Sequence, residues 1–215
     1  MTNMVADMFK DTLGKDDPNF IGLQNPGGTR ASLLDKDITY KQAAQVLPFA
    51  NTLTTTRITG AQFKKVLEQQ WQRAGTARSR HVTYLQLGVS SNVTYTYDES
   101  RKEGERITSV WVNGKPIDPK GTYSVGSGSF LIAGRDNFTE LAKGSKPVDS
   151  GKINLSAWVD WIKARKTLKP DFAKRAVSLT TSLHEGTSRD TTFTLGKPAD
   201  KAVAPTPWIS PPRML

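Results

Sequence analysis

The chain has 215 residues, with 36% hydrophobic, 8% aromatic and 23% charged side chains and no cysteine. This length is enough to bury the core of one compact domain, with or without an appendage. The lack of cysteine excludes disulfide scaffolds and thiol chemistry, and no apolar run approaches the roughly 18 residues that a membrane span needs. Thirty Lys and Arg against twenty Asp and Glu give a net charge of +10, which favours anionic partners such as phosphate esters or nucleic acid.

The first thirteen residues predict a short amphipathic helix, because Val5, Met8 and Phe9 recur at helical spacing. They lack the basic and apolar regions of a signal peptide. A helix at the first residue without a leader suits a domain cut from a longer chain, and a natural cytosolic start fits equally well.

Two further helices are predicted from their capping residues. Thr39 can cap a short helix over residues 40–46, which Pro48 ends. Thr59 and Gln62 form a capping box that opens another helix. The apolar face expected for that helix consists of Phe63, Val66, Leu67 and Trp71.

A later helix is predicted to begin with Asn154 as its cap. Its expected apolar stripe consists of Leu155, Trp158, Val159 and Ile162. Tryptophans at helical spacing are typical of core packing, so Trp158 and Trp71 are interpreted as core residues.

Strands are predicted over residues 93–97, 107–112 and 123–125, where apolar and polar side chains alternate. Asn113-Gly114 favours a type I′ hairpin turn, because both residues tolerate positive φ. Helices and strands follow one another without regular β–α alternation. The sequence therefore predicts an α+β domain over residues 1–170, with a mixed β-sheet and flanking helices.

The C-terminal part changes in composition. Within residues 171–196, two stretches that alternate apolar and hydroxyl residues flank a polar turn, which predicts an added β-hairpin. Residues 197–215 form a Pro-rich tail that cannot bury enough surface to fold alone. Its prolines are Pro198, Pro205, Pro207, Pro211 and Pro212.

The segment Asn25-Pro26-Gly27-Gly28-Thr29-Arg30 has residue types suited to a phosphate ligand. Gly27 and Gly28 let the backbone approach a ligand closely, and the Arg30 guanidinium offers a planar fork to phosphate oxygens. On its own, such a segment is more typical of a plain surface turn.

Two other segments place a phenylalanine beside a turn. Pro48 fixes the backbone just before Phe49, and Phe130 and Asp136 bracket a Gly-containing loop. Taken singly, each phenylalanine is more typical of a core than of a ligand platform.

Together, in order and spacing, the three segments resemble the C-terminal domain of the 5′-nucleotidase family, which includes UDP-sugar hydrolases and 2′,3′-cyclic nucleotide phosphodiesterases. The resemblance runs from about residue 3 to residue 162. It includes the stretches 37–40, 47–49, 59–62, 84–86 and 112–115.

In that family this domain holds the base and ribose of the substrate. The resemblance implies that Phe49 and Phe130 sandwich the base and that Asn25 contacts it. It also implies that Arg30 binds phosphate and that Asp136 accepts hydrogen bonds from the ribose hydroxyls. The residue types suit these roles, because stacking contributes roughly 1–3 kcal/mol per base and a carboxylate has acceptors for both hydroxyls.

Two positions depart from the family pattern. Thr29 stands where the family usually has an apolar residue, which predicts a small packing change. Arg135 replaces the second glycine of a Gly-Gly-Asp sequence. Arg135 either carries a steric cost, if that position needs positive φ, or contacts the ligand.

The family's metal-binding motifs, Asp-x-His, Gly-Asn-His-Asp/Glu and Gly-His-x-His, do not occur in the chain, and its two histidines, His81 and His184, lie far apart. No catalytic residue or metal ligand is therefore assigned. The resemblance implies two divalent metal ions in a separate N-terminal metallophosphoesterase domain. Without activated water the isolated chain is expected to be inactive on phosphoesters.

The favoured function is thus nucleoside or nucleotide recognition for a metal-dependent phosphoesterase; a stand-alone nucleotide sensor or carrier would share the same pocket. The alternative is a non-catalytic basic module that binds nucleic acid or another polyanion, with residues 72–81 as its patch. Three sequons, at Asn92, Asn137 and Asn154, are compatible with secretion. Members of the family are mostly periplasmic, secreted or surface-anchored, and together with the Pro-rich tail this favours an extracytoplasmic parent protein.

Overall fold

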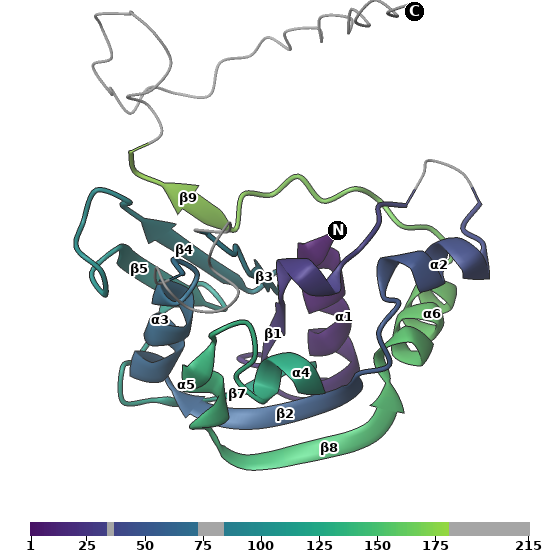
Figure 1. The fold of residues 1–215 in the computed structure, drawn as a ribbon, viewed down its shortest axis with the longest axis horizontal. Helices are drawn as coiled ribbons and strands as arrows, with labels where there is room; N and C mark the ends of the chain where they lie inside the picture. The colour runs from purple at the N-terminus through teal and green to yellow at the C-terminus, as the bar shows by residue number, and fades with distance from the viewer. Residues whose placement is uncertain (34–36, 73–83, 181–215) are drawn as a thin grey trace, which may run out of the picture. The chain divides into compact units, whose positions relative to one another are not determined.

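The computed structural model describes residues 1–33, 37–72 and 84–180 (Figure 1). Its helices are α1 (Thr2–Leu13), the 3-10 turn η1 (Pro26–Gly28), α2 (Tyr40–Val46), α3 (Gly60–Glu68), α4 (Ser129–Ile132), α5 (Thr139–Ala142) and α6 (Asn154–Arg165). Its strands are β1 (Ile21–Gln24), β2 (Thr52–Thr59), β3 (Gly88–Val89), β4 (Val93–Tyr97), β5 (Ile107–Val112), β6 (Lys115–Pro116), β7 (Thr122–Gly128), β8 (Ser145–Ile153) and β9 (Ala176–Ser178).

The α+β class is confirmed, and the strands are divided between two mixed sheets. The larger sheet has the order β3-β1-β7-β2-β8, in which β1 runs parallel to β7 and the other pairs are antiparallel. The smaller sheet has the order β6-β5-β4-β9, with β9 parallel to β4. Both turn residues between β5 and β6 have positive φ, 52° at Asn113 and 74° at Gly114, as their hairpin chemistry predicts.

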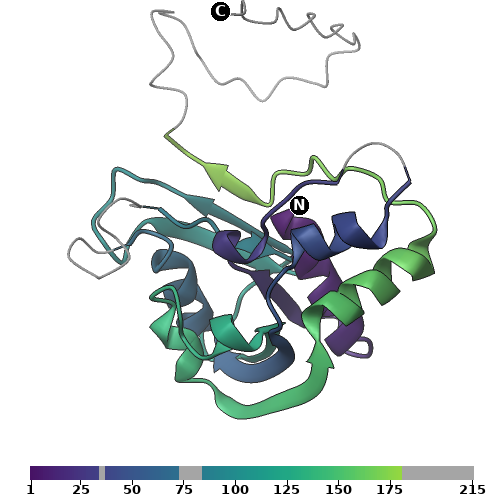
Figure 2. The ribbon, with the colours of Figure 1, turned by 45° about the vertical axis from the view of Figure 1, so that its right-hand side comes forward.

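Two groups of buried apolar side chains hold these layers together. One lies among the two sheets, α3 and α5, and the other joins α1, α2 and α6 to Leu53 of β2. Figures 1 and 2 show α1, α2 and α6 gathered at one side and α3 and α5 at the other. The approach of α1 to β1 is so close that a Cβ on Gly22 would lie 2.0 Å from the Ala6 carbonyl oxygen, so only glycine fits there.

The predicted caps of α2 and α3 are confirmed. The Thr39 and Thr59 hydroxyls accept from the backbone N–H groups of Gln42 and Gln62, whose side chains bond back to the cap N–H groups. However, α3 ends at Glu68, so Trp71 lies beyond the helix. Trp71 is half-buried and packs on the larger core, with its ring 5.0 Å from that of Tyr84.

The start of α6 differs from the prediction. Its cap position is Ile153, and Asn154 is the first helical residue, buried and without a capping hydrogen bond. The predicted stripe does face the core: Trp158 is buried, and Leu155, Val159 and Ile162 are partly buried against the same cluster. The stripe is wider than predicted, because Ala157 and Trp161 are buried as well. Trp161 stacks on Trp158, and its Nε1 donates to the Asp11 carboxylate of α1 at 3.0 Å.

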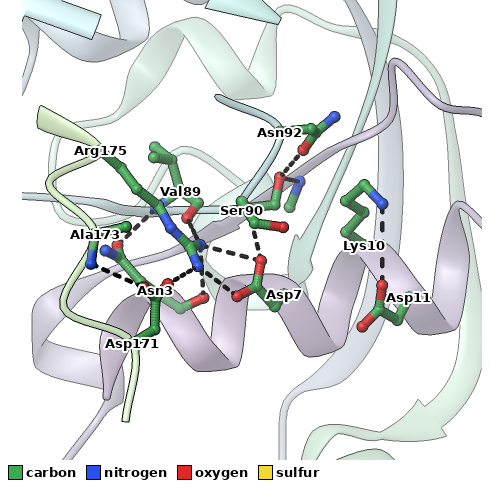
Figure 3. Close-up of polar contacts among 12 residues, drawn as sticks. Asn3, Asp7, Lys10, Asp11, Val89, Ser90, Asn92, Asp171, Ala173 and Arg175 are labelled. Atoms are coloured by element: carbon green, nitrogen blue, oxygen red, sulfur yellow. Dashed lines mark hydrogen bonds and ion pairs between the residues drawn. The ribbon is translucent and has the colours of Figure 1, made fainter. Parts of the chain in front are cut away.

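The first strand predicted for the C-terminal hairpin is β9, which pairs with β4. Residues 181–215, where the second hairpin strand and the Pro-rich tail were predicted, lie outside the described residues. Just before β9, Arg175 is buried and its guanidinium donates to Asp7 of α1, to Asp171 and to the Val89 carbonyl (Figure 3). These bonds fix residues 171–178 onto α1 and β3.

Candidate functional site

Three of the predicted site segments meet at one edge of the larger sheet. Phe49 precedes the start of β2, and Phe130 follows the end of β7; these strand ends are adjacent because Leu53 pairs with Gly128. Since β1 runs parallel to β7, Asn25 leaves the sheet at the same edge. A hydrogen bond of 3.3 Å from the Thr52 N–H to the Ser129 hydroxyl joins the two phenylalanine-bearing segments.

Asp136 reaches this edge from the loop between α4 and α5. Asn25, only 8% exposed, donates from its side-chain Nδ2 to Asp136 Oδ2 at 2.8 Å. Asn25 stands at the N-cap position of η1, just before Pro26, and its side chain makes no capping hydrogen bond there. The structure therefore brings together an amide and a carboxylate that the sequence separates by 111 positions.

The two glycines of η1 differ in how closely they are surrounded. A Cβ on Gly28 would lie 2.6 Å from both Asn25 Oδ1 and Gln24 Nε2, whereas one on Gly27 would lie 3.8 Å from Asn25 Nδ2 and Asp136 Oδ2. Gly28 thus leaves space for the polar side chains, and Gly27 exposes the backbone beside them. The Thr29 hydroxyl accepts from Gln24 Nε2 at 3.2 Å, so this departure from the family pattern adds a polar contact.

Arg30 and Phe49 lie on neighbouring segments, because the Arg30 N–H donates to the Val46 carbonyl at 2.9 Å. Arg30 is exposed, and Phe49 is 48% exposed. Phe130 is half-buried. Phe49, which keeps about half of its surface in water, is available to an apolar ligand, unlike the buried phenylalanines Phe9, Phe63 and Phe138.

Several residues of the loop that carries Asp136 have positive backbone φ values. Gly134, Asp136 and Asn137 have φ values of 76°, 55° and 64°, whereas Arg135 has no positive φ. Asp and Asn tolerate this region better than other side chains do. The steric cost considered for Arg135 is therefore absent. Arg135 is exposed, and its N–H donates to the Phe130 carbonyl at 3.3 Å.

Gln69 and Gln72, which follow the end of α3, hold this loop, and no motif in the sequence singles them out. Gln69 donates to the Thr139 hydroxyl at 2.8 Å and accepts from the Glu140 N–H at 3.2 Å. Gln72 donates to the Asp136 carbonyl at 3.2 Å and accepts from Asn137 Nδ2 at 2.7 Å. Only the three-dimensional fold brings the end of α3 beside this loop.

The three sequon asparagines have side chains that are either hydrogen-bonded or buried in the fold. Asn92 Nδ2 donates to the carbonyls of Pro18 and Phe20, both at 3.0 Å, and Asn137 Nδ2 donates to Gln72. Asn154 is buried. An N-linked glycan needs this amide nitrogen exposed, so the folded domain is a poor acceptor at all three positions.

A cavity of about 1320 Å³ lies elsewhere, between the first residues of α1, the segment before β3 and the residues at and after the end of α6. Of the predicted phosphate-binding segment, only Pro26 lines it.

The described residues contain no group of three or more acidic or histidine side chains that could hold a metal ion. Within the same ranges, no helix is long and apolar enough to cross a membrane. Most of the basic patch predicted at 72–81 lies outside the described residues.

Several known proteins are similar to this chain in sequence. The family model for the 5′-nucleotidase C-terminal domain matches residues 1–143. A 5′-nucleotidase-related protein of Glossina morsitans morsitans is 33% identical over 70% of this chain and 28% of its own length. The NAD 5′-nucleotidase of Haemophilus influenzae is 31% identical over 66% of this chain and 24% of its own length. The chain thus spans about a quarter of the length of these relatives.

Solved structures extend the similarity to the fold. The 5′-nucleotidase precursor of Thermus thermophilus superposes with a TM-score of 0.71 and 31% identity, over 83% of this chain and 35% of that one. The NAD nucleotidase of Haemophilus influenzae gives a TM-score of 0.69 and 25% identity, over 83% and 33%. The chain belongs to the family of 5′-nucleotidase C-terminal domains.

Proposed function

We propose that this chain is the nucleoside- and nucleotide-recognition domain of a 5′-nucleotidase-type phosphoesterase. The observation that carries the proposal is the Asn25–Asp136 hydrogen bond at the sheet edge from which Phe49 and Phe130 also emerge. The base stacks between the two phenylalanines, with Asn25 at its edge. Stacking on both faces contributes roughly 1–3 kcal/mol per contact and tolerates several bases.

Asp136 and Arg30 recognise the rest of the ligand in this proposal. The Asp136 carboxylate accepts from the ribose hydroxyls, and charge assistance makes such bonds stronger than neutral ones. Arg30 forms an ion pair with the phosphate, and the backbone of Gly27 and Gly28 lies beside that phosphate. These contacts favour ribonucleotides over deoxyribonucleotides, because a deoxyribose has fewer hydroxyl groups to donate hydrogen bonds to the carboxylate.

Hydrolysis requires chemistry that the described residues do not provide. They fit no metal ion, so the two divalent ions implied by the family would be held by an N-terminal metallophosphoesterase domain, the partner that we propose for this domain, in an extracytoplasmic parent protein. The isolated chain should release no phosphate from AMP. Phosphate release that depends on added divalent metal and on Phe49 would refute this.

The direct test is a calorimetric titration of the chain with AMP, adenosine and 2′-deoxyadenosine in the absence of metal. We expect dissociation constants on the order of 0.1–1 mM, since the domain alone makes only part of the contacts. Phe49→Ala and Phe130→Ala should each abolish binding. Phe172→Ala is the matched control, because Phe172 is 87% exposed and lies outside the site. No nucleoside binding at several millimolar would contradict the proposal.

Salt dependence separates this function from polyanion binding. A nucleic acid releases many counterions when it binds a basic protein, so its affinity falls steeply with salt. A mononucleotide carries little charge, so its affinity should fall only slightly. A DNA or RNA oligomer that binds more tightly than AMP, with a steep salt dependence and no need for Phe49, would favour the alternative.

A further inference from the structure

The Gln72 side chain lies behind the Asp136 loop and uses both ends of its amide there. Its Nε2 donates to the Asp136 carbonyl at 3.2 Å and to the Gln69 carbonyl at 2.9 Å, so both amide hydrogens have acceptors. Its Oε1 accepts from Asn137 Nδ2 at 2.7 Å. One side chain therefore links the end of α3 to two consecutive residues of the loop.

Those two residues have the backbone conformation that most needs support. Asp136 and Asn137 both have positive φ, at 55° and 64°. Each non-glycine residue in this region is disfavoured by about 1–2 kcal/mol, and such conformations persist where the surroundings determine them. Gln72 bonds to the carbonyl of the first and to the side chain of the second. It thereby opposes rotation of the peptide that joins them.

The conformation of this peptide sets the direction of the Asp136 carboxylate. Asn25 holds the carboxylate itself, through Oδ2, and Gln72 holds the backbone that carries it. We propose that Gln72 is a positioning residue that fixes Asp136 for recognition of the ribose hydroxyls. This inference rests on the proposed function, and Gln72 acts through Asp136 and makes no contact of its own with the ligand.

The test compares Gln72→Ala with Gln69→Ala, which removes a neighbouring glutamine whose side chain bonds to Thr139 and Glu140. In Gln72→Ala, adenosine should bind about fivefold more weakly. Its advantage, the ratio of the adenosine affinity to the 2′-deoxyadenosine affinity, should fall toward one. Gln69→Ala should keep that advantage even if it weakens binding. Gln72→Glu keeps the acceptor for Asn137 Nδ2 but loses the donor to the Asp136 carbonyl, so it should not restore that advantage.

Amide hydrogen exchange without ligand gives a second readout. Gln72→Ala should accelerate exchange at residues 136–138 and leave the β2 amides unchanged, which also shows that the variant folds. If exchange and the adenosine preference both stay at their original values, the inference about Gln72 is wrong while the proposed function stands. If exchange accelerates but the unmodified chain binds no nucleoside, the loop support is real and the proposed function fails.

Discussion

The Asn25 amide donates to the Asp136 carboxylate at 2.8 Å across the edge of the larger sheet. One residue follows β1 and the other lies between α4 and α5, so the bond joins the turn that carries Arg30 to the loop that follows Phe130. Because the acceptor is a carboxylate, the bond is charge-assisted and orients both side chains. Changes at either residue should therefore affect contacts made by the other.

Asp136→Asn should weaken adenosine binding about tenfold and 2′-deoxyadenosine binding less. The amide keeps the shape of the carboxylate but loses charge and an acceptor, and bonds to charged groups contribute about 1.5–3 kcal/mol. Calorimetry with both nucleosides measures the difference. Asp98→Asn is the control, since that carboxylate lies in the loop after β4. An equal loss of affinity for both nucleosides would show that Asp136 does not recognise the ribose hydroxyls.

Gly28→Ala should weaken nucleotide binding more than Gly27→Ala does. The new methyl group at position 28 would lie 2.6 Å from Asn25 Oδ1 and must displace that side chain, whereas the methyl group at position 27 makes ordinary contacts at 3.8 Å. The displaced groups are side-chain ends, so we expect a stability loss of only about 1 kcal/mol. AMP titration and urea unfolding separate the two effects. Equal affinities for the two variants would contradict this assignment.

Arg135→Gly should destabilise the chain slightly, by up to about 1 kcal/mol, because glycine adds unfolded-state entropy and no positive φ is relieved. Gly134→Ala is the contrasting variant. Gly134 has a φ of 76°, and its new methyl group would lie 3.0 Å from Ala142 Cβ, so the loss should be larger. Urea unfolding measures both. A more stable Arg135→Gly would mean that position 135 is strained.

Local sequence signals predicted the elements whose cause is local. The Thr39 and Thr59 caps and the Asn113-Gly114 turn depend on residues within a few positions of one another, and all three are confirmed. β8 carries no such signal, because nearly all of its side chains are exposed and no apolar alternation marks it. It forms through pairing with β2, and the bond between the two strands from the Thr52 hydroxyl to Asp149 spans 97 positions.

The residues of the candidate site also fall into two groups, those that a sequence motif marks and those that only the fold brings together. Asn25, Arg30, Phe49, Phe130 and Asp136 were selected by motif resemblance, and the fold gathers the segments that carry them at one edge. The sequence places Gln72 only in the alternative basic patch at 72–81, because a glutamine after a helix carries no nucleoside-binding motif and its partners are 64 and 65 positions away. Asn154 was assigned as a cap from its type alone, but its N–H donates to the Asn51 carbonyl and its side chain is buried within the first turn.

Alkaline pH should destabilise the fold through Tyr95 and Tyr84. Burial raises the pKa of Tyr95 to about 12 from the value of 10.0 expected in the unfolded chain, and burial also raises the pKa of Tyr84. The folded state therefore keeps its phenol protons longer. Its stability should be complete below pH 10 and fall as the pH rises from 10 to 12, by about 2–3 kcal/mol for Tyr95.

Tyr95→Phe tests this directly. Unfolding free energies measured between about pH 9 and 12 should decline less steeply in the variant, although its stability at about pH 8 falls by about 1 kcal/mol because the bond to Gln70 Oε1 is lost. Tyr40→Phe, which removes an exposed phenol, is the control. A decline as steep as that of the unmodified chain would show that Tyr95 does not cause it.

Arg175→Met should lower the free energy of unfolding by about 3 kcal/mol. The Arg175 side chain is 4% exposed, and its loss leaves the Asp7 carboxylate and the Val89 carbonyl without their shared donor (Figure 3). Removing one partner of a buried ion pair is costly because the other charge stays desolvated. Lys152→Met, which breaks an exposed pair with Asp160, should cost less than about 1 kcal/mol.

The same pair of variants tests whether residues 171–178 belong to the folded domain, although the family model ends at residue 143. Arg175 joins this segment to α1 through Asp7, and its carbonyl accepts from the Tyr95 N–H at 2.9 Å. In Arg175→Met, hydrogen exchange should accelerate first at β9 and at β4, its partner. If exchange at β4 is unchanged and the two variants are equally stable, the segment adds little to the fold, and the domain ends before Arg175.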